Sequence, residues 1–223
     1  MTTDTAIPFR QSPVKLLIGL FYLLGLLACA CNAIASATPP LQAVTHAAVN
    51  APSPRNIQFT RVTSRDRLSQ ASANAIVQDH HGYIWFGTQE GLNRYDGYEM
   101  VVYEHHSNTP GSLSHDWVWS VYLDTEGTLW VGTDGGGLNR FNQADETFTH
   151  FRHDPDNNRS LSNDRVRAIF QDARGNYWIG TDGGGLNHFD PGSGEFTRYS
   201  HNEANPDSLP GDTVLAIYED SKG

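Results

Sequence analysis

The chain has 223 residues, of which 38% are hydrophobic and 18% are charged, a balance that is typical of a soluble globular domain. Its formal net charge of −10 argues against the basic surface with which proteins bind nucleic-acid phosphates, so we expect no nucleic-acid partner. Both cysteines, Cys29 and Cys31, lie near the N-terminus, so no disulfide bond can brace the remainder of the chain.

The N-terminal segment has the three parts of an export signal. Arg10 and Lys15 precede an apolar run, which extends from Leu16 to Ala30, and the small residues Ala35-Ser36-Ala37 follow it. A basic flank, a short apolar core and a small-residue exit are typical of a secretory signal peptide. We therefore predict that residues 1–37 direct export and are cleaved.

Two alternatives for this segment would also place the following residues outside the cytoplasm. One is a retained membrane anchor, because the apolar run extended to Ile34 approaches the ~20 residues that a bilayer requires. The other is lipid attachment, since the sequence LLAC that ends at Cys29 resembles a bacterial lipobox.

The remainder of the chain contains a repeated segment. The sequence WVGTDGGGLNRF, which starts at Trp130, returns as WIGTDGGGLNHF from Trp178. A looser copy, WFGTQEGLNRY, starts at Trp85, so the three tryptophans stand 45 and 48 residues apart. A fixed period of roughly 20–50 residues is typical of repeat architectures, in which each copy is one supersecondary unit.

Each repeat also carries an Asp-x-x-Gly motif, which predicts a tight turn between two strands. The aspartate of such a turn accepts hydrogen bonds from nearby backbone amides, and the glycine adopts a positive φ. Short segments rich in Val, Ile, Tyr and Phe precede the aspartates, as expected of buried strands. The motif occurs at Asp79/Gly82, Asp124/Gly127, Asp172/Gly175 and Asp220/Gly223.

Four short strands in each unit of about 45 residues predict an all-β fold made of β-propeller blades, each a four-stranded antiparallel sheet. We expect the repeated tryptophans to be buried between neighbouring sheets. Ser-Leu segments are expected to lead the chain into each blade. The predicted domains are a signal peptide or membrane anchor at 1–37, a flexible linker at 38–56, and a partial propeller at 57–223 with repeats at about 72–116, 117–164, 165–212 and 213–223.

This count of repeats predicts an incomplete propeller. Propellers close with roughly four to eight blades, whereas the sequence holds about three full blades and partial units at both ends. We therefore expect the chain to be the N-terminal fragment of a longer protein.

The sequence nominates no catalytic, cofactor or metal site. It lacks the Gly-x-Ser-x-Gly motif of serine hydrolases and the lysine of a phosphate-binding loop. The turn aspartates recur once per repeat, which favours backbone capping over metal binding. The pairs His80-His81 and His105-His106 do not recur and lack metal-site spacing, so we interpret them as solvated loop residues.

Positions that differ between repeats are the candidates for ligand recognition. Five and seven residues before the turn aspartate stand Trp119 and Trp117 in one repeat, and Arg167 and Arg165 in the next. The first strand of a propeller blade lies nearest the central channel, so we predict that these four side chains line a ligand surface at the channel mouth. Tryptophan offers a stacking face, as for a sugar ring, and arginine a fork for carboxylates. The alternative is that they merely cover a loop.

The repeats resemble the two-component regulator propeller family, whose blades carry the pattern D-x-x-G-x-x-W-x-G-T-x-x-G-L-x-R-[YF]. Residues 79–95 fit this pattern, and residues 124–141 fit it with one extra glycine. Residues 172–189 fit it with His188 in place of the arginine. WD40 repeats are disfavoured because x-Gly-Thr, and no aspartate, follows the tryptophan, and kelch repeats because their glycine pair is placed differently.

The resemblance implies the sensor region of a membrane-bound bacterial signalling protein. Such propellers lie on the periplasmic side of the inner membrane, ahead of a transmembrane helix and a cytoplasmic histidine kinase, often hybrid, or diguanylate cyclase. A small molecule or oligosaccharide would then change the packing of two propellers in a homodimer, and the remainder of the parent protein would carry the output. This chain itself is expected to have no enzymatic activity. The alternatives are a secreted propeller enzyme acting on polysaccharide and a structural interaction propeller.

Overall fold

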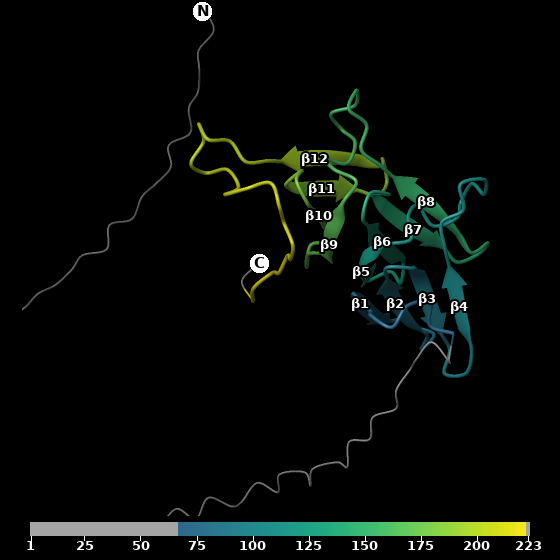
Figure 1. Cartoon of the computed structure of the whole chain (residues 1–223). Helices are drawn as coiled ribbons and strands as arrows, with labels where there is room; N and C mark the ends of the chain where they lie inside the picture. Colours follow the sequence, from purple (N-terminus) through teal and green to yellow (C-terminus); the bar gives the residue numbers. More distant parts are fainter. Residues whose placement is uncertain (1–66, 222–223) are drawn as a thin grey trace, which may run out of the picture. The chain divides into compact units, whose positions relative to one another are not determined.

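Each tryptophan repeat folds into one four-stranded antiparallel sheet, whose strands pair in chain order (Figure 1). The structure, a computed structural model, describes residues 67–221. The predicted export segment at 1–37, the linker at 38–56 and the start of the propeller at 57–66 lie outside the described residues. Among the described residues no helix has the length and apolar character needed to cross a membrane.

The three sheets are named blades 1, 2 and 3 in chain order. Blade 1 contains β1 (Ala75–Gln78), β2 (Ile84–Thr88), β3 (Gly91–Tyr95) and β4 (Met100–Tyr103). Blade 2 contains β5 (Val118–Leu123), β6 (Leu129–Thr133), β7 (Leu138–Asn142) and β8 (Thr147–Phe151). Blade 3 contains β9 (Val166–Gln171), β10 (Tyr177–Thr181), β11 (Leu186–Asp190) and β12 (Glu195–Tyr199).

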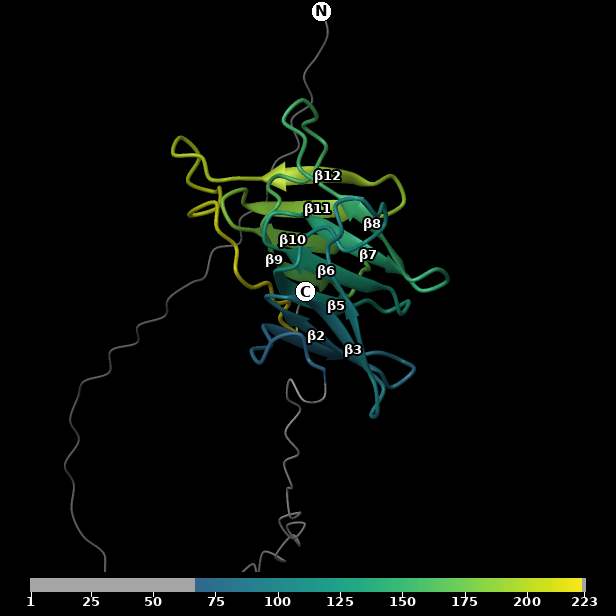
Figure 2. The ribbon, with the colours of Figure 1, turned by 45° about the vertical axis from the view of Figure 1, so that its right-hand side comes forward.

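The first strands of the three blades lie side by side, and the blades fan out from them. Strand β5 contacts both β1 and β9, whereas β4, β8 and β12 are the far edge strands of their sheets. Figures 1 and 2 show this arrangement from two sides. The prediction of four-stranded propeller blades is therefore confirmed.

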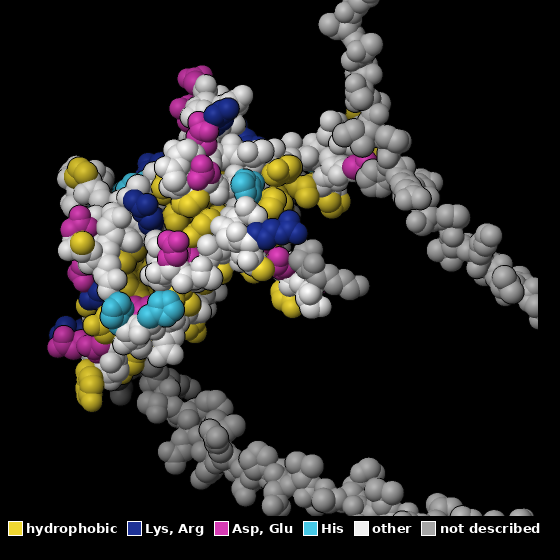
Figure 3. Space-filling model, turned by 180° about the vertical axis from the view of Figure 1, so that it is seen from behind, with side chains coloured by type: hydrophobic (Ala, Val, Ile, Leu, Met, Phe, Trp, Pro, Cys, Tyr) yellow, Lys and Arg dark blue, Asp and Glu magenta, His cyan; other side chains and the backbone are white. Residues whose placement is uncertain are grey.

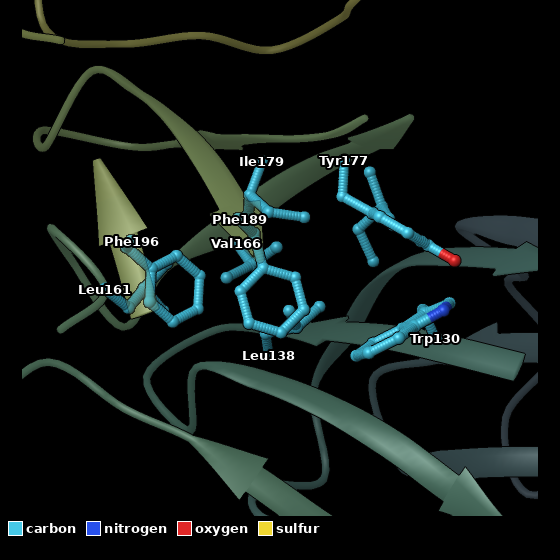
Figure 4. Close-up of a cluster of buried hydrophobic side chains, with 9 residues drawn as sticks. Trp130, Leu138, Leu161, Val166, Tyr177, Ile179, Phe189 and Phe196 are labelled. Carbon is cyan, nitrogen blue, oxygen red and sulfur yellow. The ribbon is translucent and has the colours of Figure 1, made fainter. Parts of the chain in front are cut away.

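Aromatic side chains fill the space between adjacent blades. Trp85 is 2% exposed, and its ring centroid lies 5.1 Å from that of Phe141 in blade 2. Trp130 is equally buried, and its ring lies 5.5 Å from Tyr177 and 5.4 Å from Phe189 in blade 3 (Figure 4). Aromatic pairs of this kind stabilise by about 0.5–1.5 kcal/mol beyond the burial of their surface. The predicted burial between sheets is confirmed for these two tryptophans.

Trp178 has a different environment. It is only partly buried, because no further sheet packs against the outer face of blade 3 in the described part of the chain. Its ring contacts His188 and Tyr199 of its own blade, with centroids 5.1 and 6.0 Å away.

A glycine after each tryptophan lets the inner strand of the next blade approach. A Cβ added at Gly87 would lie 2.6 Å from Val118 Cγ1, and one added at Gly132 would lie 2.6 Å from Val166 Cγ1. Both distances are far below van der Waals contact, so the Trp-x-Gly-Thr motif reflects close packing between blades.

A buried asparagine fixes the loop that leads into each blade. Asn187 is fully buried, accepts a hydrogen bond from the Ser162 amide at 3.0 Å and donates one to Ser162 Oγ at 2.8 Å. Leu161, the residue before this serine, is buried in the core. Asn93 with Ser69 and Asn139 with Ser114 repeat the amide contact. The Ser-Leu segments therefore anchor the entry to each blade.

The segment predicted as the first strand of a fourth blade, residues 216–219, does not form a strand. Contact with blade 3 is made just before it, where the Val214 amide donates to Thr181 O at 2.9 Å. Because no described strand pairs with residues 216–219, their backbone lacks a β ladder, and Tyr218 is 88% exposed. The predicted turn at 220–223 extends beyond the described residues.

Candidate functional site

In each of the three blades, the carboxylate of the turn aspartate organises the turn between the first and second strands. Asp124 Oδ1 accepts hydrogen bonds from the amides of Glu126 and Thr128, at 3.0 and 2.8 Å. Its Oδ2 accepts one from the indole Nε1 of Trp130 at 2.8 Å. The same indole bond joins Asp79 to Trp85 and Asp172 to Trp178. The predicted backbone capping is confirmed.

The indole bond was not predicted, although the constant spacing of six residues between aspartate and tryptophan is a signal for it. Within residues 67–221, no group of three or more His, Cys, Asp or Glu side chains could hold a metal ion.

A histidine at the end of each fourth strand holds the connection to the next blade. The amide of His105 donates to Asp116 Oδ1 at 2.6 Å, and its ring Nδ1 lies 2.8 Å from Leu113 O. His153 and His201 make the same two contacts. His105 lies in an exposed loop, as predicted, and these contacts give it a structural role that was not predicted. The pair does not recur, but the single histidine does, at intervals of 48 residues.

The four predicted ligand-contacting residues lie where the inner strands of blades 2 and 3 begin. Trp117 immediately precedes β5, and Trp119 lies within it. Their ring centroids are 5.2 Å apart, with an interplanar angle of 33°. The guanidinium carbon of Arg167, on β9, lies 3.9 Å from the Trp119 ring centroid. The structure thus brings Trp117, Trp119 and Arg167 into one stack that crosses from blade 2 to blade 3.

Two aspartates complete this cluster, and the sequence analysis missed both. Arg167 Nη2 donates to Asp182 Oδ2 at 2.7 Å. Arg165 lies outside the stack, with its Nε 3.7 Å from Asp134 Oδ1 and its side chain 59% exposed. The hydrogen bond from Arg167 lowers the pKa of Asp182. The sequence contained a signal for these two aspartates. The residue after the Trp-x-Gly-Thr motif is an aspartate in the second and third repeats, whereas it is Gln89 in the first.

We name the group of Trp117, Trp119, Arg165 and Arg167, with Asp134 and Asp182, the inner-strand cluster. Three of its buried nitrogen atoms have no hydrogen-bond partner among the described residues: Trp117 Nε1, Trp119 Nε1 and Arg167 Nε. An unsatisfied buried donor costs about 1–3 kcal/mol. These three nitrogen atoms could donate hydrogen bonds to the oxygen atoms of a ligand if a side chain of the cluster rotated and exposed them.

Comparison with known proteins identifies the repeats. Residues 67–90, 112–135 and 160–183 each match the two component regulator propeller family. Each matched segment runs from the entry loop through the inner strand and the aspartate turn to the tryptophan strand. These are regulator propeller repeats.

Two solved structures have folds similar to this chain. The extracellular domain of the hybrid two component system BT3049 from B. thetaiotaomicron is 27% identical, with a TM-score of 0.61 over 70% of this chain and 22% of that chain. The extracellular domain of the hybrid two component system BT4673 from the same organism is 28% identical, with a TM-score of 0.56 over 68% of this chain and 21% of that chain.

A curated relative matches over a shorter stretch. Histidine kinase P4 of Formosa agariphila is 39% identical over 59 residues, which are 26% of this chain and 4% of that protein. The matched part of the chain thus spans a small fraction of this relative and about a fifth of each solved neighbour.

Proposed function

We propose that the blades belong to the extracytoplasmic ligand-sensing region of a membrane-bound bacterial signalling protein. The observation that carries this proposal is the regulator propeller repeat, together with the similarity to extracellular domains of hybrid two component systems. The predicted export segment at residues 1–37 supports the same location.

A reporter fusion tests the location. Alkaline phosphatase, which folds only outside the cytoplasm, is fused after Gly223 and expressed in a bacterium. We expect an active fusion, and loss of activity when residues 1–37 are deleted. An inactive full-length fusion, combined with an active cytoplasmic reporter at the same position, would contradict the proposal.

The inner-strand cluster is the proposed ligand site. Trp117 and Trp119 supply flat apolar faces, and the unsatisfied nitrogen atoms would favour a ligand rich in acceptor oxygens. Arg167 is hydrogen-bonded to Asp182 at 2.7 Å, whereas Arg165 makes a longer contact of 3.7 Å with Asp134 and is 59% exposed, so Arg165 is the better fork for a ligand carboxylate. These features fit an oligosaccharide, with sugar rings stacked on indole and a carboxylate beside Arg165.

Binding measurements on variants test this site. The full chain is titrated with acidic and neutral oligosaccharides, and binding is followed by tryptophan fluorescence and calorimetry. Trp117→Ala should lower the affinity for both ligand types at least tenfold, whereas Arg165→Ala should affect only acidic ligands. Leu215→Ala is the matched control, because Leu215 is 64% exposed and stands at the equivalent sequence position of the next repeat, five residues before the turn aspartate. Equal affinities in all four proteins would rule out the cluster as the site.

The proposed function also includes a signalling activity in the parent protein that responds to the ligand. A histidine kinase or diguanylate cyclase in the parent protein, acting as a homodimer, would respond if the ligand bound two packing states with different affinity. Autophosphorylation or cyclase assays of the parent protein, with and without the ligand, measure this response. An output that is unchanged by a ligand bound at the cluster would contradict it.

The surface agrees with a small-molecule ligand better than with a nucleic acid. Figure 3 shows acidic, basic and histidine side chains interspersed on the face that it displays. No broad basic surface gathers on that face.

A further inference from the structure

The repeats allow two equivalent blade junctions to be compared within one molecule. At the junction of blades 2 and 3, Tyr177 is 6% exposed and lies against Trp130 and Phe189. Its hydroxyl donates to Asp124 Oδ2 at 2.7 Å. Figure 4 shows this hydroxyl on the same side of the cluster as the Trp130 indole nitrogen. Asp124 Oδ2 therefore accepts two hydrogen bonds, from an indole and from a phenol.

At the junction of blades 1 and 2, Leu129 occupies the position that Tyr177 has in the next repeat. Both residues directly precede a repeated tryptophan. Leucine is shorter than tyrosine and has no hydroxyl. Among the described residues, Asp79 Oδ2 consequently accepts a single hydrogen bond, from Trp85 Nε1 at 2.8 Å.

A cavity lies where the tyrosine is missing. It has a volume of about 360 Å³, and its lining includes Asp79, Trp85 and Leu129. Small-molecule sites usually have volumes of roughly 300–1,000 Å³. No tyrosine side chain of the following blade fills this space, in contrast to the second junction.

Part of the remaining lining suits an aromatic ring, and the other part is polar and includes His80, His81 and Glu126. Tyr83 and Phe141 add aromatic surface. The Arg94 guanidinium lies 5.2 Å from the Tyr83 ring centroid and 5.6 Å from that of Trp85. Glu146 of blade 2 holds this arginine at 2.8 Å, so the ion pair crosses the junction beside the cavity. A flat apolar ligand with a single hydroxyl donor would match these walls and the free side of the carboxylate.

We propose that this cavity binds a phenolic ligand, whose ring takes the place of the absent tyrosine and whose hydroxyl donates to Asp79 Oδ2. The site lies at the aspartate-turn end of the inner strands, opposite the end that carries the inner-strand cluster. It is therefore separate from the oligosaccharide site proposed above and does not depend on it.

Ligand pairs test the role of the hydroxyl. p-Cresol, which is the tyrosine side chain itself, is titrated into the full chain and followed by ligand-observed NMR. 4-Methylanisole has the same ring but no donor, and we expect it to bind at least tenfold more weakly. Equal binding of the two compounds, or no saturable binding of p-cresol, overturns the proposal.

Variants test the location. Leu129→Tyr places the tyrosine of the third repeat into the cavity, and we expect it to weaken p-cresol binding at least tenfold while the protein stays folded by circular dichroism. Leu129→Phe serves the same purpose if the tyrosine variant does not fold. Leu215→Ala, an exposed residue far from the cavity lining, should leave p-cresol affinity unchanged. Undiminished p-cresol binding in a folded Leu129 variant would show that the ligand lies elsewhere and would overturn the proposal.

Discussion

The indole Nε1 of Trp130 donates a hydrogen bond to Asp124 Oδ2 at 2.8 Å, and this bond links the turn between β5 and β6 to the core between blades 2 and 3. The indole ring is 2% exposed and the aspartate 3%. One residue pair thus ties a local turn to packing between blades, and the same pair occurs in every described repeat.

Removing the carboxylate at the better-packed junction should be severe. Asp124→Ala leaves the buried donors Trp130 Nε1 and Tyr177 OH without an acceptor, and each such donor costs about 1–3 kcal/mol. For the two donors together we expect a loss of about 2–6 kcal/mol in the free energy of unfolding, measured with urea. Both aspartates also accept two backbone amides, but Asp79→Ala removes the acceptor of one side-chain donor, the Trp85 indole, and should therefore lose less. A loss in Asp124→Ala no greater than in Asp79→Ala would contradict this ranking.

Stability should fall in acid because of Asp172. Burial raises the pKa of Asp172, but hydrogen bonds from Asn176, Trp178 and backbone amides outweigh it and lower the pKa from 3.8 to about 2. A lowered folded-state pKa stabilises the fold above the unfolded pKa, and that stabilisation is lost as the pH falls through the folded value. We expect Tm to drop between pH 3.8 and about pH 2.

Asp172→Asn provides the control for this acid effect. The variant should have a lower Tm at neutral pH and a shallower dependence of Tm on pH within the same window. Identical slopes in the variant and the unmodified chain would assign the acid sensitivity to other carboxyl groups, such as Asp124, whose pKa is also lowered.

The close approach of blades 2 and 3 predicts a sensitive glycine. A methyl group at Gly132 would clash with Ser120 Oγ of its own blade and would lie 2.6 Å from Val166 Cγ1 and 2.9 Å from Val166 O, so both Ser120 and blade 3 would have to move. Overpacking of this kind costs about 1–3 kcal/mol, and we expect Gly132→Ala to lose that much in urea unfolding. Gly211→Ala meets nothing within 4 Å and should be nearly neutral. Equal stabilities of the two variants would refute close packing at Gly132.

The repeated tryptophans should differ in their contribution to stability. Trp130→Ala removes a ring packed against Tyr177 and Phe189, and core truncations of this size cost about 3–5 kcal/mol. Trp178→Ala truncates a partly exposed ring on the outer face of blade 3 and should cost distinctly less. Thermal unfolding of both variants measures the difference, and equal shifts in Tm would mean that another part of the protein covers Trp178.

The sequence could predict the blades because their determinants are local and repeated. The turn aspartates, the glycines with positive φ and the alternating strands act within about 45 residues, so each repeat reports the same structure independently. One prediction from local sequence was wrong, the strand at residues 216–219. Residues 216–219 have the composition of a strand, but a strand also needs a hydrogen-bonded partner, and the described residues provide none.

By itself, the sequence determined the kind of unit, the number of described blades and the segments where Trp117, Trp119, Arg165 and Arg167 begin the inner strands. Only the tertiary structure decided which side chains meet across the junctions. The stack of Arg167 on Trp119 and the hydrogen bond from the Tyr177 phenol to Asp124 join residues that a repeat pattern treats as separate. The physical reason is that these contacts depend on how closely two blades pack, and Leu129 in place of a tyrosine changes one junction while the repeat itself stays the same.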